Sequence, residues 1–309
     1  MPVIALFGPT GVGKTAVAIE LADRLREQGR DPVAISADAL QVYDGLPILT
    51  GAPTRQEQQR LEHRLVGFVA LDEEFSAGRY MELAHEEIDS ALEAGRTPIV
   101  VGGTGLYLRA ALAELHMAPA PPPELRAGLE ERLSREGAPA LHAEVASRAP
   151  GLALEIEPGD GKRLVRTLEL LELGHPPPRP AGDSQLWTGD TRHPTLLVGL
   201  TMERAGLYAA IDARVEAMVA AGVVAEVQRA EAAGVSRTAR HALGFEELLR
   251  GDIEAMKQRT RNYARRQLTW MRKLEGVRLT DVTGLKPGQP AACIAAAAAG
   301  ASARGPVEL

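Results

Sequence analysis

Eight consecutive residues near the N-terminus form a pattern that is typical of phosphate binding. Residues 8–15 read GPTGVGKT, match Gly-x-x-x-x-Gly-Lys-Thr, and lie between an apolar run and a helical segment. Glycine permits a tight turn whose N–H groups point inward, and the start of the helix adds partial positive charge. The Lys14 ammonium can contact outer phosphates, and the Thr15 hydroxyl can bind Mg²⁺. The motif therefore predicts a polyphosphate or diphosphate site rather than a plain glycine-rich turn.

Asp38 is the second candidate, because it comes directly after the apolar stretch at 31–36. Ligands of parallel sheets bind at the carboxyl ends of strands, so this carboxylate is expected beside the phosphate loop. P-loop nucleotide hydrolases usually place an Asp after a second strand, but here the apolar run at 97–101 leads into GGTG. Asp38 could be a general base, a metal-side ligand or simply a helix N-cap. Nearby, the Gln41 amide could bind an adenine edge.

A basic segment near the C-terminus could contact nucleic acid. Residues 257–273 read KQRTRNYARRQLTWMRK, which contains seven Lys or Arg residues and no acid. Cations neutralise phosphates and rings such as Tyr263 and Trp270 can stack on bases, whereas the alternative is a solvated basic surface. Arg163 and Arg166 form a second, smaller basic patch.

Alternating strand and helix patterns must position these residues. Apolar runs at 2–7, 31–36, 97–101 and 195–201 predict buried strands, and helices are expected at 15–28, 80–92, 203–221, 222–234 and 253–274. Such alternation indicates βαβ units. The predicted fold class is α/β, a P-loop NTPase-like parallel sheet flanked by helices, with a helical insertion domain.

Two proline-rich breaks, near residue 120 and at 176–180, suggest the domain organisation. The segment between them is polar and Arg- and Glu-rich, with helical character and no strand pattern. We therefore expect an α/β core with C-terminal helices at 1–117 and 193–284, and a helical insertion at 118–192. The Ala-rich tail at 285–309 is expected to be a short helix or disordered.

Composition excludes several classes of protein. The 309 residues include 35 Lys or Arg and 41 Asp or Glu, and the net charge of -6 excludes a globally basic nucleic-acid coat protein but not a local basic face. Cys293 is the single cysteine, so an intramolecular disulfide and a CxxC zinc site are excluded. No signal peptide pattern and no run of about 18 apolar residues is found. We expect a cytoplasmic monomer without a membrane segment.

Taken together, the motifs resemble those of the tRNA dimethylallyltransferase family, also called tRNA isopentenyltransferases. The matching stretches are GPTGVGKT, ISADALQVYDGLPI, VVGGTGLYLRAAL, DGKRLVRTLELL, LYAAIDARVEAMVAAG, ALGFEEL and TRNYARRQLTWMRK. GGTGLYLRA and Y-A-R-R-Q-x-T-W are much more specific than the phosphate loop. The sequence departs from the family at Ala52, where Lys is usual, at Glu62, where His is common, and at Ala210, where Arg is often found.

The resemblance implies transfer of a dimethylallyl group from dimethylallyl diphosphate to N6 of the adenosine beside the anticodon in tRNA, with release of diphosphate. It implies a catalytic set of Asp38 as general base, Thr10 and Arg214, and a Mg²⁺ on Thr15. The implied diphosphate-binding residues are Gly8, Pro9, Thr10, Gly11, Val12, Gly13, Lys14 and Thr15. The implied tRNA-binding residues are Asp38, Ala39, Leu40, Gln41, Thr104, Arg126, Lys162, Arg163, Leu164, Val165, Arg166, Arg240, His241, Ala242, Leu243, Gly244 and Phe245.

Three other interpretations remain open from the residues alone. A P-loop small-molecule kinase would bind ATP, but it would be expected to carry the missing second-strand Asp. A prenyltransferase of free adenine nucleotides would need neither the helical insertion nor the basic helix. A tRNA-binding module without activity would not need an intact phosphate loop together with Asp38.

Overall fold

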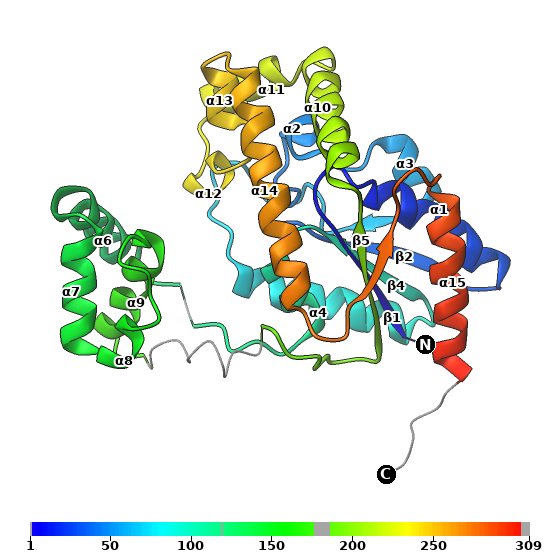
Figure 1. Ribbon diagram of the computed structural model, residues 1–309, viewed down its shortest axis with the longest axis horizontal. Helices are drawn as coiled ribbons and strands as arrows, with labels where there is room; N and C mark the ends of the chain where they lie inside the picture. Colours follow the sequence, from blue (N-terminus) through cyan, green and yellow to red (C-terminus); the bar gives the residue numbers. More distant parts are fainter. Residues whose placement is uncertain (1, 119, 176–185, 304–309) are drawn as a thin grey trace, which may run out of the picture. The chain divides into compact units, whose positions relative to one another are not determined.

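The computed structural model describes residues 2–118, 120–175 and 186–303 (Figure 1). The chain forms two compact units, which we call the sheet unit, Met1–Leu115 with Gly189–Leu309, and the helical unit, His116–Thr188. The second proline-rich break and the last residues of the Ala-rich segment lie outside the described ranges.

One six-stranded sheet organises the sheet unit. Its strands are β1 (Val3–Phe7), β2 (Pro32–Ala37), β3 (His63–Arg64), β4 (Thr97–Gly102), β5 (Thr195–Thr201) and β6 (Arg278–Asp281), in the order β3-β2-β4-β1-β5-β6. Every pairing is parallel. The predicted α/β fold with a parallel sheet is thereby confirmed. The sequence patterns did not predict the two edge strands β3 and β6, which are short and lack an apolar run.

Helices cover the sheet and extend beyond it. They are α1 (Lys14–Glu27), α2 (Pro47–Thr50), α3 (Arg55–Arg60), α4 (Ala77–Glu93), α5 (Gly105–Leu112), α10 (Arg204–Ala220), α11 (Val223–Ala233), α12 (Arg237–Arg240), α13 (Phe245–Leu249), α14 (Ile253–Lys273) and α15 (Gly288–Ala303). Right-handed crossovers put α1 and α4 on opposite faces of the sheet, because the chain runs toward one edge from β1 to β3 and turns back across the sheet from β3 to β4. No helix in the described ranges is long and apolar enough to cross a membrane.

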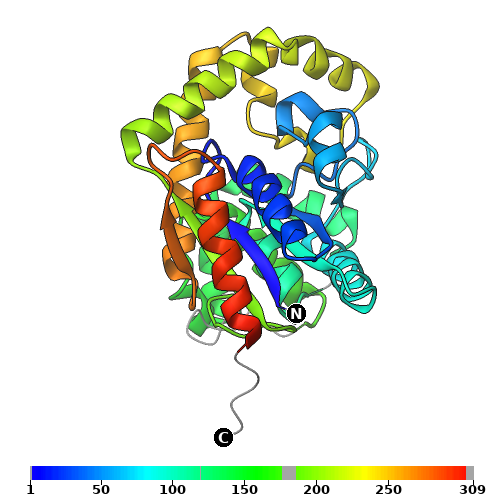
Figure 2. The ribbon, with the colours of Figure 1, turned by 90° about the vertical axis from the view of Figure 1, so that its right-hand side faces the viewer.

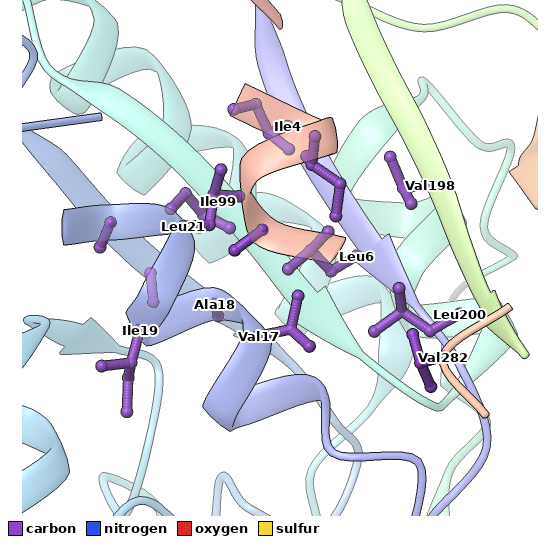
Figure 3. Close-up of a cluster of buried hydrophobic side chains, with 14 of the residues drawn as sticks. Ile4, Leu6, Val17, Ala18, Ile19, Leu21, Ile99, Val198, Leu200 and Val282 are labelled. Carbon is purple, nitrogen blue, oxygen red and sulfur yellow. The ribbon is translucent and has the colours of Figure 1, made fainter. Parts of the chain in front are cut away.

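The main core lies between the sheet and the pair α1 and α15 (Figures 2 and 3). Strand residues such as Ile4, Leu6 and Val198 meet Val17 and Leu21 of α1 in one buried cluster. Helix α15 contributes Ala291, Ile294, Ala295 and Ala298 to the same cluster. The segment expected as a tail therefore contains a helix that belongs to the sheet unit. Its small alanine side chains let it approach α1 closely, and they lose no rotamer freedom on packing.

The described residues of the helical unit form four helices around their own small core. They are α6 (Pro123–Glu136), α7 (Ala138–Arg148), α8 (Pro150–Ala153) and α9 (Gly161–Glu172). Leu129, Leu141, Val145, Leu164 and Leu168 pack together at its centre. The described residues of this unit contain no strand. This agrees with the expected helical segment between the two proline-rich breaks.

Candidate active site

A cavity of about 1050 Å³ in the sheet unit opens at the carboxyl ends of β2 and β4. Its wall includes five phosphate-loop residues, Thr10, Gly11, Gly13, Lys14 and Thr15. Asp38 and Gln41 line it from the end of β2, Arg214 from α10, and Ala242 and Leu243 from the turn before α13. The structure therefore gathers the predicted catalytic residues around one space, although they come from distant parts of the sequence.

The phosphate loop, residues 8–15, adopts a conformation that requires glycine. Gly11 and Gly13 have φ angles of 85° and 88°, a left-handed region that other residues rarely adopt. Gly13 is the N-cap of α1, so the first N–H groups of that helix have no acceptor within the helix and can bind an anion. Val12 instead packs into the main core. One side of the loop thus faces the cavity, and packing of Val12 in the main core fixes the other side.

The Lys14 ammonium lies on the floor of this site. It donates hydrogen bonds to the carbonyl oxygens of Gly8 and Pro9, at 2.9 and 3.1 Å. Burial lowers the pKa of Lys14 to about 8; nearby Asp38 raises it and Arg214 lowers it further. Two cations, Lys14 and Arg214, therefore face the same cavity, an arrangement that an anionic ligand would stabilise.

Asp38 closes a turn rather than capping a helix. Its Oδ1 accepts the N–H of Leu40 at 3.0 Å, and the next helix begins only at Pro47. The Thr104 hydroxyl accepts the Ala39 N–H at 3.4 Å and lies 3.4 Å from the hydroxyl of Tyr263. Burial and the charge of Asp38 raise the pKa of Tyr263 to about 12. The predicted tRNA-binding residues at 38–41 and Thr104 are therefore neighbours.

Gln41 is held by internal contacts at both ends of its amide. Its Oε1 accepts a hydrogen bond from Ser36 at 3.0 Å, and its Nε2 donates to the carbonyl of Gly51 at 3.1 Å. Gly51 in turn lies against the guanidinium of Arg214, and a Cβ atom on Gly51 would collide with it. Burial lowers the pKa of Arg214, while Asp38 and Glu57 raise it. In this structure both ends of the Gln41 amide bond to the protein, and this holds the loop that lies against Arg214.

The predicted tRNA-binding segment 240–245 is divided between the cavity and the core. Arg240 forms ion pairs with Glu231 and Glu246, each at 2.6 Å, and its guanidinium lies over the ring of Phe245 at 5.6 Å. Phe245 itself is fully buried. Gly244 has a φ angle of 96° and starts α13. Arg240 therefore has two acidic partners within the protein, which the sequence did not predict.

In the helical unit, two predicted tRNA-binding arginines share one carboxylate. Arg126 donates two hydrogen bonds to Glu169, at 2.6 and 2.8 Å, and Arg166 donates a third at 3.0 Å. The side chain of Glu169 is completely buried. Burial raises its pKa, but the hydrogen bonds from Arg126 and Arg166 outweigh this effect and the net shift is downward. The carboxylate therefore stays charged and orients both guanidinium groups.

The predicted segment 162–166 has two sides. Lys162 and Arg163 are exposed, and Arg166 is half-buried. Leu164 and Val165 pack into the core of the helical unit. Only the basic members of this segment can therefore offer their side chains to RNA.

The basic helix α14 is also more divided than its sequence suggests. Three of its cations have acidic partners on other elements: Lys257 with Glu216, Arg259 with Glu247 and Arg261 with Asp212, at 2.9, 2.8 and 2.6 Å. Further along, Arg265 bonds Asn262 at 2.6 Å, and the Arg266 guanidinium lies 5.4 Å from the centre of the Tyr263 ring. Asn262, Arg265, Arg266, Thr269 and Trp270 line a second hollow of about 590 Å³. The C-terminal half of α14 is therefore the part suited to an anionic partner.

The sequence patterns did not indicate three supporting residues: Gly51, Glu169 and Gln267. Glu169 could have been noticed as an acid within the apolar pattern of α9, and Gln267 as a polar residue on the buried face of α14. Gly51 carried no such signal, because its importance depends on Arg214 from a distant helix. Within the described ranges, no group of three or more His, Cys, Asp or Glu side chains could hold a metal ion.

Comparison with known proteins places this geometry in a family. The family model for IPP transferase matches residues 41–274. The tRNA dimethylallyltransferase of Rhodospirillum centenum is 43% identical over 286 residues, 88% of each chain.

The crystal structure of the full-length tRNA isopentenylpyrophosphate transferase from Bacillus halodurans is similar with a TM-score of 0.69 and 31% identity, covering 97% of this chain and 96% of that one. A eukaryotic dimethylallyltransferase acting on tRNA is similar with a TM-score of 0.79 and 25% identity, covering 99% and 81%. The chain therefore belongs to the tRNA dimethylallyltransferase family of prenyltransferase enzymes.

Proposed function

We propose that this protein transfers a dimethylallyl group from dimethylallyl diphosphate to N6 of the adenosine beside the anticodon in tRNA, releasing diphosphate. One observation carries the proposal: the phosphate loop and Asp38 line the same cavity, whereas β4 ends in Gly102 without a carboxylate. A P-loop site without that second acid suits a ligand whose diphosphate leaves, rather than a nucleotide that is hydrolysed. The names of the relatives support the same reaction.

The leaving diphosphate gains negative charge as its C–O bond breaks. N–H groups at the start of α1, the Lys14 ammonium and the Arg214 guanidinium would stabilise this charge, since all of them line the cavity before any ligand enters. The Thr10 hydroxyl would donate to the bridging oxygen. Preorganised donors of this kind need no rearrangement during the reaction.

The residues around the loop fit a Mg²⁺ ion that arrives with its substrate. Mg²⁺ usually binds one or two protein oxygens together with phosphate oxygens and waters. Thr15 lines the cavity and offers a hydroxyl oxygen. Thr15 would hold the ion through this oxygen. The ion would neutralise charge on the diphosphate.

Asp38 would act as the general base. As the bond between N6 and the first prenyl carbon forms, the bond from that carbon to the diphosphate oxygen breaks. The amine then loses one proton, which the Asp38 carboxylate accepts. Such a base contributes about 10²–10⁴-fold to the rate. The adenosine must leave its stack to reach a cavity at the end of the sheet, so base flipping is expected.

We assign tRNA binding mainly to the insertion at 118–192 and to the C-terminal half of α14, and catalysis to the core at 1–117 and 193–284. Two observations support this division. Glu169 orients Arg126 and Arg166 in the insertion, and Arg265 and Arg266 are exposed on α14. We expect the enzyme to act as a monomer in the cytoplasm, where Cys293 remains reduced.

The deciding experiment is incubation of the protein with dimethylallyl diphosphate, Mg²⁺ and unmodified tRNA, followed by mass spectrometry of the nucleosides. We expect one dimethylallyl group on an adenosine of the anticodon loop, and none with Lys14→Ala. Modification of free AMP but not of tRNA would make the protein an adenylate prenyltransferase. Phosphoryl transfer from ATP without prenyl transfer would make it a kinase.

A further inference from the structure

Gln267 joins two catalytic segments through a single buried amide. Its side chain is on α14, and the residue is only 4% exposed. Its Oε1 accepts the backbone N–H of Thr10 at 2.9 Å, and its Nε2 donates to the carbonyl of Gly103 at 2.7 Å. The amide therefore connects the phosphate loop to the turn between β4 and α5.

Position 103 must be glycine for this amide to fit, because any side chain there would occupy the space that the Gln267 amide fills. A Cβ atom on Gly103 would collide with Nε2 of Gln267 and would lie 3.2 Å from the carbonyl oxygen of Gly8 and 3.3 Å from Nζ of Lys14. Three parts of the site thus meet at one point. A shift of the Gln267 side chain would therefore displace both the phosphate loop and the Lys14 ammonium.

Neighbouring residues of α14 hold the rest of the same turn. Tyr263, one helical turn before Gln267, lies 3.4 Å from the hydroxyl of Thr104. Trp270 packs so closely on Gly105 that a Cβ atom there would overlap its ring. Positions three and four apart lie on one side of a helix, so a single helix face holds three consecutive residues of the turn.

We infer that Gln267 is a positioning residue for the transfer reaction, an inference that rests on the proposed function. By accepting the Thr10 N–H, Gln267 fixes the backbone that carries the Thr10 hydroxyl. It also removes that N–H from phosphate binding, so the diphosphate is left to other N–H groups of the loop and to those at the start of α1. A misplacement of about 1 Å in such a site can cost about 10²-fold in rate.

Two variants and one control test this role. Gln267→Met keeps the length of the side chain but removes both hydrogen bonds, whereas Gly103→Ala keeps Gln267 and displaces its amide. Gln258→Met is the control, because Gln258 is exposed on the same helix and bonds only Asn262 and Arg261 in the described structure. The measurements are kcat, KM for tRNA, the Kd of inorganic diphosphate with Mg²⁺, and Tm.

We expect Gln267→Met to lower kcat by about 10²-fold and to weaken diphosphate binding by about tenfold, with KM for tRNA unchanged. Gly103→Ala should give the same pattern, and the double variant should be no worse than either single one, since both break one bridge. If Gln267→Met does not fold, Gly103→Ala carries the test.

Two results would overturn the inference. One is a Gln267→Met protein whose kcat and diphosphate Kd equal those of Gln258→Met, even if its Tm is lower. The other is full additivity of the two substitutions. Failure of the wild-type protein to modify tRNA would instead refute the proposed function, and the diphosphate measurements would still decide whether Gln267 organises the loop.

Discussion

Arg214 rests on Gly51, and no other residue type would leave its guanidinium where it is. A Cβ atom at position 51 would overlap Nη2 of Arg214, and Gly51 has a φ angle of 60° at the end of α2. This contact joins the loop after β2 to α10. It also lies beside Ala52 and Ala210, and all four residues line the cavity. Arg214 and Lys14 therefore provide much of the positive charge beside the proposed diphosphate.

Gly51→Ala should displace the Arg214 guanidinium and raise KM for dimethylallyl diphosphate. The control is Gly29→Ala, because Gly29 has a similar φ angle of 74° but open space around it. Both substitutions should lower the free energy of unfolding by about 1 kcal/mol through backbone strain. Only Gly51→Ala should change steady-state kinetics, and equal KM values in the two variants would contradict the role of this contact.

Asp38→Asn should lower turnover by at least about 10²-fold while tRNA binding is retained. Asparagine can still accept the Leu40 N–H, so the turn is preserved and only the basic group is lost. Asp38→Ala should give a similar loss of turnover. Asp72→Asn, an exposed carboxylate outside the cavity, should behave like the wild type. Normal turnover of Asp38→Asn in single-turnover assays would exclude Asp38 as the base.

Diphosphate binding should weaken as pH rises through about 8. Burial lowers the pKa of Lys14 to about 8 in the free protein, and a bound anion would raise this pKa again. Binding therefore takes up a proton above this pH, and the affinity present below pH 8 is lost progressively as the pH rises.

Calorimetric titration with inorganic diphosphate between about pH 7 and 9 measures the effect. Lys14→Arg should remove the pH dependence, because a guanidinium stays charged. An unchanged Kd across this range in the wild type would show that Lys14 does not bind the ligand.

Neutralising the C-terminal half of α14 should reduce the salt dependence of tRNA binding. Arg265→Gln should lower the slope of log Kd against log salt by about one unit if Arg265 contacts one phosphate. Lys257→Gln is a matched control, because Lys257 is paired with Glu216 and Glu254. Its slope should stay close to that of the wild type. Equal slopes for both variants would mean that Arg265 is an ordinary solvated cation.

Local sequence patterns were sufficient for the strands that are buried on both faces. β1 and β2 are buried at every position, so a continuous apolar run is sufficient to predict each of them as a buried strand. β6 reads RLTD and is largely exposed, so only its pairing with β5 makes it a strand. The alanines of α15 have no polar face that would indicate a periodicity. Its position is decided by packing on α1, which no local pattern reports.

The candidate site divides in the same way. The phosphate loop and Asp38 were predictable, because each is a short motif next to a strand whose end faces ligands. The bond between Thr10 and Gln267 spans 257 residues of sequence, and no periodicity links its two ends. The acidic partners of Lys257, Arg259 and Arg261 come from other helices, so a segment that appears strongly basic in sequence is partly neutral in the fold.

The buried Glu169 has a consequence for how the helical unit would meet RNA. A free arginine side chain samples many rotamers, and restricting it costs about 2 kcal/mol of conformational entropy. Arg126 and Arg166 have already lost most of that freedom, because one carboxylate holds both. The trio also carries a net charge of only about one, so general attraction to any polyanion is weak. Two guanidinium groups that are rigid and carry little net charge are better suited to discriminate among RNA shapes than to attract RNA from a distance.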